Sequence, residues 1–175
     1  MQPSFDLRLR TMIKALSETV LPAIDGSNKA ALEQTNIVIG SLELLREQID
    51  FAHWFEVVDA KGMAATVDAL AAITALPSSD TACEVAARPL AVPGRHDTRL
   101  STLRDANREL RDVISTLIEE AFALDDEGIR KQVQQVVLER SEAQISRERA
   151  FVAGTHFDVF PDTLLSIEES LRRAA

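Results

Sequence analysis

Four polar side chains that could together hold a metal ion recur at three-residue intervals in the segment 47–56: Glu47, Asp50, His53 and Glu56. Residues three apart lie on the same face of an α-helix, so these carboxylate and imidazole groups could point toward one ion. The sharper hypothesis is a metal site with Asp50, His53 and Glu56 as ligands. A solvated helix face without any ligand explains the same spacing.

Asp50 and His53 also have the acidic-x-x-His spacing of carboxylate-bridged metal bundles. In those bundles two helices each supply such a motif, and two other helices each add a glutamate. This chain has no second copy of the motif, because neither His96 nor His156 follows a carboxylate by three residues. The missing motif favours the solvated helix face.

Two further places could carry chemistry. His156 lies two residues before Asp158, and a histidine beside a carboxylate can act as a general base, although a triad also needs a positioned nucleophile. Cys83 is the only thiol, and we expect it to be buried or unreactive. Glycine-rich phosphate loops, the GxSxG elbow and the HExxH motif are absent. The sequence therefore favours a non-catalytic protein and predicts no cofactor.

The element that organises the chain is a long amphipathic helix predicted from Leu100 to Leu124, where apolar residues recur at intervals of three and four. A polar residue, Asn107, lies in this apolar seam. Such a residue either sets the register between associated chains or makes a hydrogen bond within the monomer. Arg104 and Arg111 lie on a neighbouring strip beside acidic residues, which indicates an exposed face of ion pairs or, alternatively, an interface or anion site.

The other predicted elements are also helices. A first helix is expected to begin after Ser4 and to run to about Val20, with Pro22 as its stop signal. A long second helix is expected to end at Lys61 and Gly62. The fold class is all-α: a bundle of about four main antiparallel helices, with short helices and one long crossover loop, in a single domain over 1–175. The remaining predicted segments are a short helix over 63–76, an irregular connection over 77–97 with room for a short helix, a helix over 129–152 and a C-terminal helix around 164–171.

Composition excludes several classes of function. The formal net charge of −9 opposes binding to nucleic acid or to an anionic membrane surface. The most apolar stretch, 62–76, contains Asp68 and is too short to span a bilayer. A single cysteine excludes a disulfide within the chain, and charged residues near the start do not fit a secretory signal. We expect a cytoplasmic protein that binds neither nucleic acid nor membrane.

The segment 20–45 contains the sequence VLPAIDG followed by a long apolar helix with Asn36 and Gly40. It resembles the start of a family of small, all-helical bacterial proteins of unknown function. Genes of that family often neighbour acyl-CoA dehydrogenases and aminoglycoside-phosphotransferase-like kinases. The resemblance covers about a quarter of the chain and implies an accessory role near acyl-CoA metabolism. It transfers no catalytic residue.

These observations together predict a non-catalytic helical bundle that acts through its apolar helix faces, either as a homo-oligomer or as the accessory partner of another protein. The alternative is a bundle, either a binding protein or an enzyme, that binds a metal or a small molecule through the helix face of Glu47, Asp50, His53 and Glu56.

Overall fold

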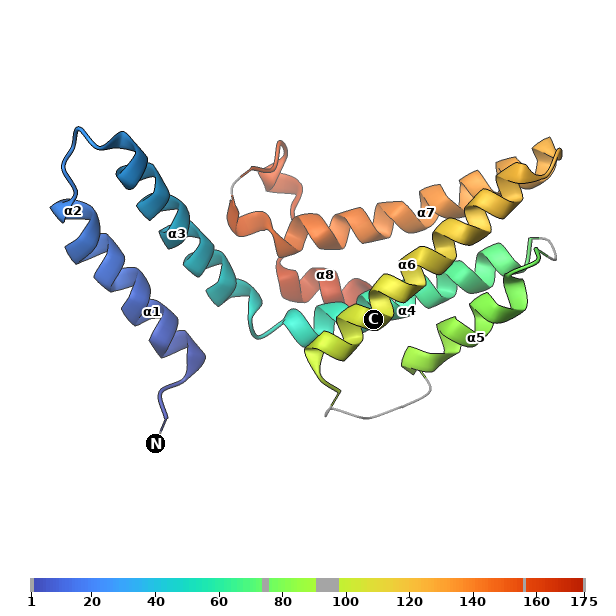
Figure 1. Cartoon of the computed structure of the whole chain (residues 1–175), viewed down its shortest axis with the longest axis horizontal. Coiled ribbons are helices and arrows are strands. Elements are labelled where there is room, and N and C mark those ends of the chain that lie inside the picture. Colours follow the sequence, from blue (N-terminus) through green and yellow to red (C-terminus); the bar gives the residue numbers. More distant parts are fainter. Residues whose placement is uncertain (1, 74–75, 91–97, 156, 175) are drawn as a thin grey trace. The chain divides into compact units, whose positions relative to one another are not determined.

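The structure is a computed structural model that describes residues 2–73, 76–90, 98–155 and 157–174. All the regular elements within these ranges are helices, which confirms the all-α prediction (Figure 1). Contacts group the chain into two compact units. Unit 1 comprises Met1–Phe51 with Arg149–Ile167, and unit 2 comprises Ala52–Glu148 with Glu168–Ala175. Each unit is described by itself, and the single domain stays a prediction.

Unit 1 is built on a helical hairpin. Helix α1 (Phe5–Ala15) begins at the predicted cap, where the Ser4 hydroxyl accepts a hydrogen bond from the Leu7 amide at 3.2 Å. The helix continues through a π-helical turn (Leu16–Val20) into the short α2 (Leu21–Ala23). The helical turns therefore extend to Ala23, past the predicted end at about Val20 and past Pro22. The chain leaves the helix at Ile24.

Helix α3 (Lys29–Gln48) returns alongside α1. Its first turn is capped by Asn28, whose side-chain oxygen accepts from the Ala31 amide at 3.1 Å. Asp6 and Arg46 form an ion pair at 3.5 Å between the two helices, so the start of α1 lies beside the end of α3. Among the described residues of these helices, Leu9 alone is fully buried. The hairpin therefore has almost no core of its own.

Unit 2 contains the main apolar core. Its helices are α4 (Ala52–Ala71), α5 (Ser79–Leu90), α6 (Leu100–Ala123), α7 (Glu127–Phe151) and α8 (Ile167–Ala174), whose outermost residues at the unit boundary belong to unit 1. Helix α4 packs against both α5 and α6. The predicted seam of α6 is confirmed, since Leu110, Leu117 and Ala121 are fully buried. The core also includes Val67 and Leu70 of α4, Val85 of α5 and Val133 of α7.

The predicted long second helix is wrong in one respect, because the chain leaves the helix at residues 49–51 and forms α3 and α4 separately. Its predicted end is also wrong. Helix α4 continues through Gly62, where an added Cβ would lie only 3.3 Å from Nη2 of Arg147. Gly62 is thus a point of close approach, not a helix end. Within the segment 77–97, α5 is longer than the short helix expected there; residues 91–97 and 74–75 lie outside the described residues.

The C-terminal third differs from the prediction mainly at its boundaries. Helix α7 begins at Glu127, where the Asp126 side chain accepts hydrogen bonds from the backbone amides of the first turn. Short 3-10 turns at Ala153–Thr155 and Pro161–Thr163 follow, and α8 begins at Ile167, later than predicted. Within the described part of the chain, no helix has the length and apolar character needed to cross a membrane.

Candidate functional site

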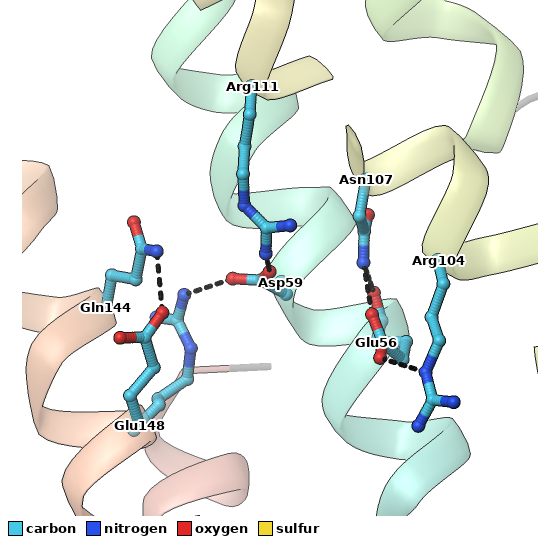
Figure 2. Close-up of polar contacts among 8 residues, drawn as sticks. Glu56, Asp59, Arg104, Asn107, Arg111, Gln144 and Glu148 are labelled. Carbon is cyan, nitrogen blue, oxygen red and sulfur yellow. Dashed lines mark hydrogen bonds and ion pairs between the residues drawn. The ribbon is translucent and has the colours of Figure 1, made fainter. Parts of the chain in front are cut away.

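A group of polar and charged side chains joins α4, α6 and α7 inside unit 2. We call it the polar ladder; its members are Glu56, Asp59, Arg104, Asn107, Arg111 and Arg147. Asp59 is the most enclosed charge, with a side chain only 1% exposed. Arg111 of α6 donates to its Oδ2 at 2.8 Å, and Arg147 of α7 donates to its Oδ1 at 3.3 Å. Figure 2 shows Arg111 reaching Asp59 from the neighbouring helix.

The electrostatics of Asp59 reflect two opposed effects. Burial raises the pKa of this carboxyl above its ordinary value, while Arg111 and Arg147 lower it in part. Burial, together with repulsion from the nearby Glu148 carboxylate, therefore outweighs the effect of the two arginines on this pKa. The two guanidinium groups thus lie near two carboxylates, Asp59 and the more exposed Glu148.

The rest of the polar ladder consists of hydrogen bonds that Asn107 and Arg104 donate to Glu56. Asn107, which is fully buried, donates from its side-chain nitrogen to the Glu56 carboxylate at 2.7 Å and to the Glu56 backbone carbonyl at 3.0 Å. Arg104 donates to the other carboxylate oxygen at 2.9 Å (Figure 2). Asn107 thus makes its hydrogen bonds within unit 2, to a neighbouring helix. Its role in setting the register of an oligomer, and that of Arg104 and Arg111 in an interface, stay predictions.

Beside the ladder, residues of α4, α6 and α7 line a cleft of about 290 Å³. The wall from α7 is mainly polar, with Arg140, Ser141, Gln144 and Arg147, although Val137 and Ala143 also line it. The facing wall, from α4 and α6, is mainly apolar. Such a two-faced cleft is suited to a small molecule with one charged end. Its apolar lining includes Met63, Ile114 and Ile118.

The structure does not support the common helix face on which the metal hypothesis rests. Asp50 lies in the turn between α3 and α4, so the equal spacing no longer follows one helix. His53 contacts the backbone carbonyl of Thr98 at 3.2 Å through Nε2. The Glu56 carboxylate is paired with Arg104 in the polar ladder. Glu47 belongs to α3 in unit 1. Among the described residues, no three histidine, cysteine or acidic side chains are grouped to hold a metal.

The predicted pair of His156 and Asp158 is described only in part, because His156 lies outside the described residues. Asp158 accepts two hydrogen bonds from Arg149, at 2.7 and 2.8 Å. This pairing, with the Phe160 backbone amide, lowers the pKa of Asp158 to about 2. Asp158 is therefore an ionised partner of Arg149 and a poor general base at neutral pH. Cys83 lies half-buried on α5.

Unit 1 carries a different feature, an exposed apolar strip along the hairpin. We define the apolar strip as Phe5 and Met12 of α1 with Val38 and Leu45 of α3; these side chains are between 45% and 66% exposed. On each helix the two residues are seven apart, so they lie on one side, two turns from each other.

The Asp6–Arg46 ion pair and the helical rotation place all four residues of the strip together. Along α1, Phe5 and Met12 lie to one side of the buried Leu9, whereas Asp6 lies to the other. Along α3, Val38 and Leu45 lie on the side away from Arg46. The ion pair therefore marks one edge of the contact between the helices, and the apolar strip follows the opposite edge.

Sequence reasoning missed Asp59, Arg140 and Arg147. Asp59 could have been found, because it interrupts the apolar run of α4 between Val58 and Ala60. A charge in such a run is either paired or functional. Nothing marked Arg147, which lies among other charged residues in the polar half of α7 and is nevertheless only 8% exposed.

Comparisons of the chain with family models, curated proteins and solved structures find no match.

Proposed function

We propose that this protein is a non-catalytic helical protein of the cytoplasm that acts as a homo-oligomer, and that two copies associate through the apolar strip. The observation that carries the proposal is the row of half-exposed apolar side chains on a hairpin that buries only Leu9 completely. In a two-helix hairpin each helix buries only the side that faces the other helix, so an apolar strip along the edge stays exposed. Packing against a second hairpin would bury the apolar strip.

A second copy is the occupant that the hairpin fits best. Two antiparallel hairpins that meet along their apolar edges form a four-helix bundle around a two-fold axis. Residues 1–51 carry five basic and seven acidic side chains, close to neutral, while the whole chain carries −9. Contact between two copies through this segment therefore brings little net charge together. Contact through the more acidic remainder of the chain would cause stronger repulsion.

The test is sedimentation equilibrium of the full chain over a wide range of concentration, with variants that place a charge in the strip. Met12→Glu and Val38→Glu are expected to shift the chain to monomer, because each puts a carboxylate into the proposed contact. Leu7→Glu is the matched control. Leu7 is also an exposed apolar residue of α1, 54% exposed, but it lies on the face turned away from α3.

Circular dichroism shows whether each variant keeps its helices, so that loss of association is separated from loss of fold. A wild-type chain that stays monomeric at several hundred micromolar refutes the proposal. Equal loss of association in Leu7→Glu and in Met12→Glu refutes the assignment to the apolar strip.

As the alternative occupant we propose a different protein, in line with the accessory role near acyl-CoA metabolism that the resemblance of the segment 20–45 implies. A monomeric chain whose strip residues are fully labelled by a solvent-carried radical probe would favour this alternative. Protection of the same residues in a concentration-dependent manner favours the second copy.

A further inference from the structure

We propose that the cleft between α7 and the pair α4 and α6 binds a small monocarboxylate with a short apolar tail. This site lies wholly in unit 2 and is independent of the apolar strip in unit 1. The inference rests on the arrangement of charge along one wall, the apolar character of the other wall and the size of the cleft.

The charged wall is one face of α7. Arg140, Gln144 and Arg147 follow one another at helical spacing of four and three, so their side chains lie on the same side of the helix and all line the cleft. In a helix that packs on a core, this face is normally apolar. Guanidinium and amide groups here instead present several hydrogen-bond donors to one small space.

The positive charge of this wall is not fully compensated. Arg147 is nine-tenths buried, yet its Nε has no hydrogen-bond partner, and its Nη2 is 3.3 Å from the Asp59 carboxylate that Arg111 shares. Arg140 lies at the rim with no ion-pair partner among the described residues. A carboxylate between Arg140 and Arg147 would accept hydrogen bonds from guanidinium groups whose hydrogen-bonding capacity is not fully used within the protein.

The opposite wall determines the rest of the ligand. Met63 of α4 is almost fully buried, and Ile114 and Ile118 of α6 are half-buried at the edge of the core. An apolar ligand tail packed against these side chains is removed from water, which favours binding. A cleft of about 290 Å³ holds the volume of about ten waters. This volume suits a ligand of roughly ten non-hydrogen atoms, as in a short aliphatic or aromatic acid.

The charge balance favours a monoanion. Gln144 donates to Glu148 at 2.8 Å, which places an acidic side chain beside the arginine wall (Figure 2). A phosphate group with two negative charges would face this carboxylate and Asp59 together. A planar carboxylate matches the fork of a guanidinium and adds only one charge.

The test is isothermal titration of the full chain with hexanoate, using hexan-1-ol and hexyl phosphate as comparison probes. We expect hexanoate to bind with a dissociation constant of about 1 mM or tighter and at least tenfold more tightly than either probe. Arg140→Gln should weaken hexanoate about tenfold, because it removes one charged donor at the rim. Arg108→Gln removes the same charge from an exposed site of α6 outside the cleft and should leave binding unchanged.

A second variant tests the apolar wall without touching the arginines. Ile118→Thr should reduce the gain in affinity from butanoate to hexanoate, while binding of acetate stays the same. Failure of hexanoate to bind at 10 mM, equal binding of hexan-1-ol, tighter binding of hexyl phosphate, or equal effects of Arg140→Gln and Arg108→Gln would each overturn the proposal. Circular dichroism confirms that the exposed Arg140 variant remains folded.

Discussion

Replacing Asp59 should expose how strongly the buried ion pair is coupled. In Asp59→Leu, Arg147 keeps its charge in a site that is only 8% exposed and loses its carboxylate. Breaking a buried pair from one side costs about 3–5 kcal/mol. We expect the lower end, about 3 kcal/mol, because the cleft beside Arg147 gives its guanidinium a path toward water.

Removal of the cation should cost less than removal of the anion. In Arg147→Met, Asp59 still accepts from Arg111 at 2.8 Å, so the carboxylate stays paired. The expected loss is about 1.5 kcal/mol, the typical contribution of one charged hydrogen bond. In the double variant no buried charge is left without a partner. Since burial raises the pKa of Asp59 despite its two arginines, the pairing does not fully offset the desolvation cost of the carboxylate. The double variant should therefore lie within about 1 kcal/mol of wild type.

Urea unfolding monitored by the fluorescence of Trp54 measures these differences. Trp54 is the only tryptophan and belongs to α4, so it reports on unit 2 itself. Asp105→Asn on the exposed Asp105–Arg108 pair is the control and should change stability by less than about 0.5 kcal/mol. The three values imply a coupling energy of at least about 3.5 kcal/mol between Asp59 and Arg147. Single variants that each lose under 1 kcal/mol and add without coupling would refute the buried pair.

Three further predictions concern other contacts. Asn107→Leu should lower the stability of unit 2 by about 1–3 kcal/mol without changing the sedimentation coefficient, because its partners lie within the chain. Glu120→Ala should cost about 1 kcal/mol and speed amide exchange at the start of α5, since Glu120 accepts from the Ser78 amide at 3.1 Å. The Asp158–Arg149 pair should stabilise its loop above pH 3.8 and lose that effect as the pH falls toward the Asp158 pKa of about 2. A carbon-detected NMR titration that places this pKa at or above 3.8 would contradict the last prediction.

The sequence allowed part of the candidate site to be anticipated. Asn107 stood out as a polar residue in an apolar seam, and Arg104 and Arg111 as cations on the strip beside it. Glu56 was also selected, but for metal binding instead of the ladder. Each residue was found through the periodicity of its own helix. Their partners were not found, because helical periodicity says which face a residue occupies and nothing about which helix lies opposite.

The break between α3 and α4 shows a second limit. Apolar residues continue at helical spacing through residues 49–51, so a single long helix is the natural reading of the sequence. Gly62, in contrast, has the usual sign of a helix end and lies inside α4. A local pattern reports the preference of a segment, whereas the place of a turn also depends on the packing on either side.

The sequence by itself determined that this chain is helical, where α1 begins and which residues of α6 face the core. These features depend on short-range capping and on the separation of apolar from polar residues, both of which are read along the chain. Only the tertiary structure decided that Asp59 meets Arg147, that Gly62 admits the guanidinium and that a cleft remains beside them. Asp59 and Arg147, for example, are 88 positions apart. Those contacts depend on the distance between two helix surfaces, and no local pattern encodes that distance.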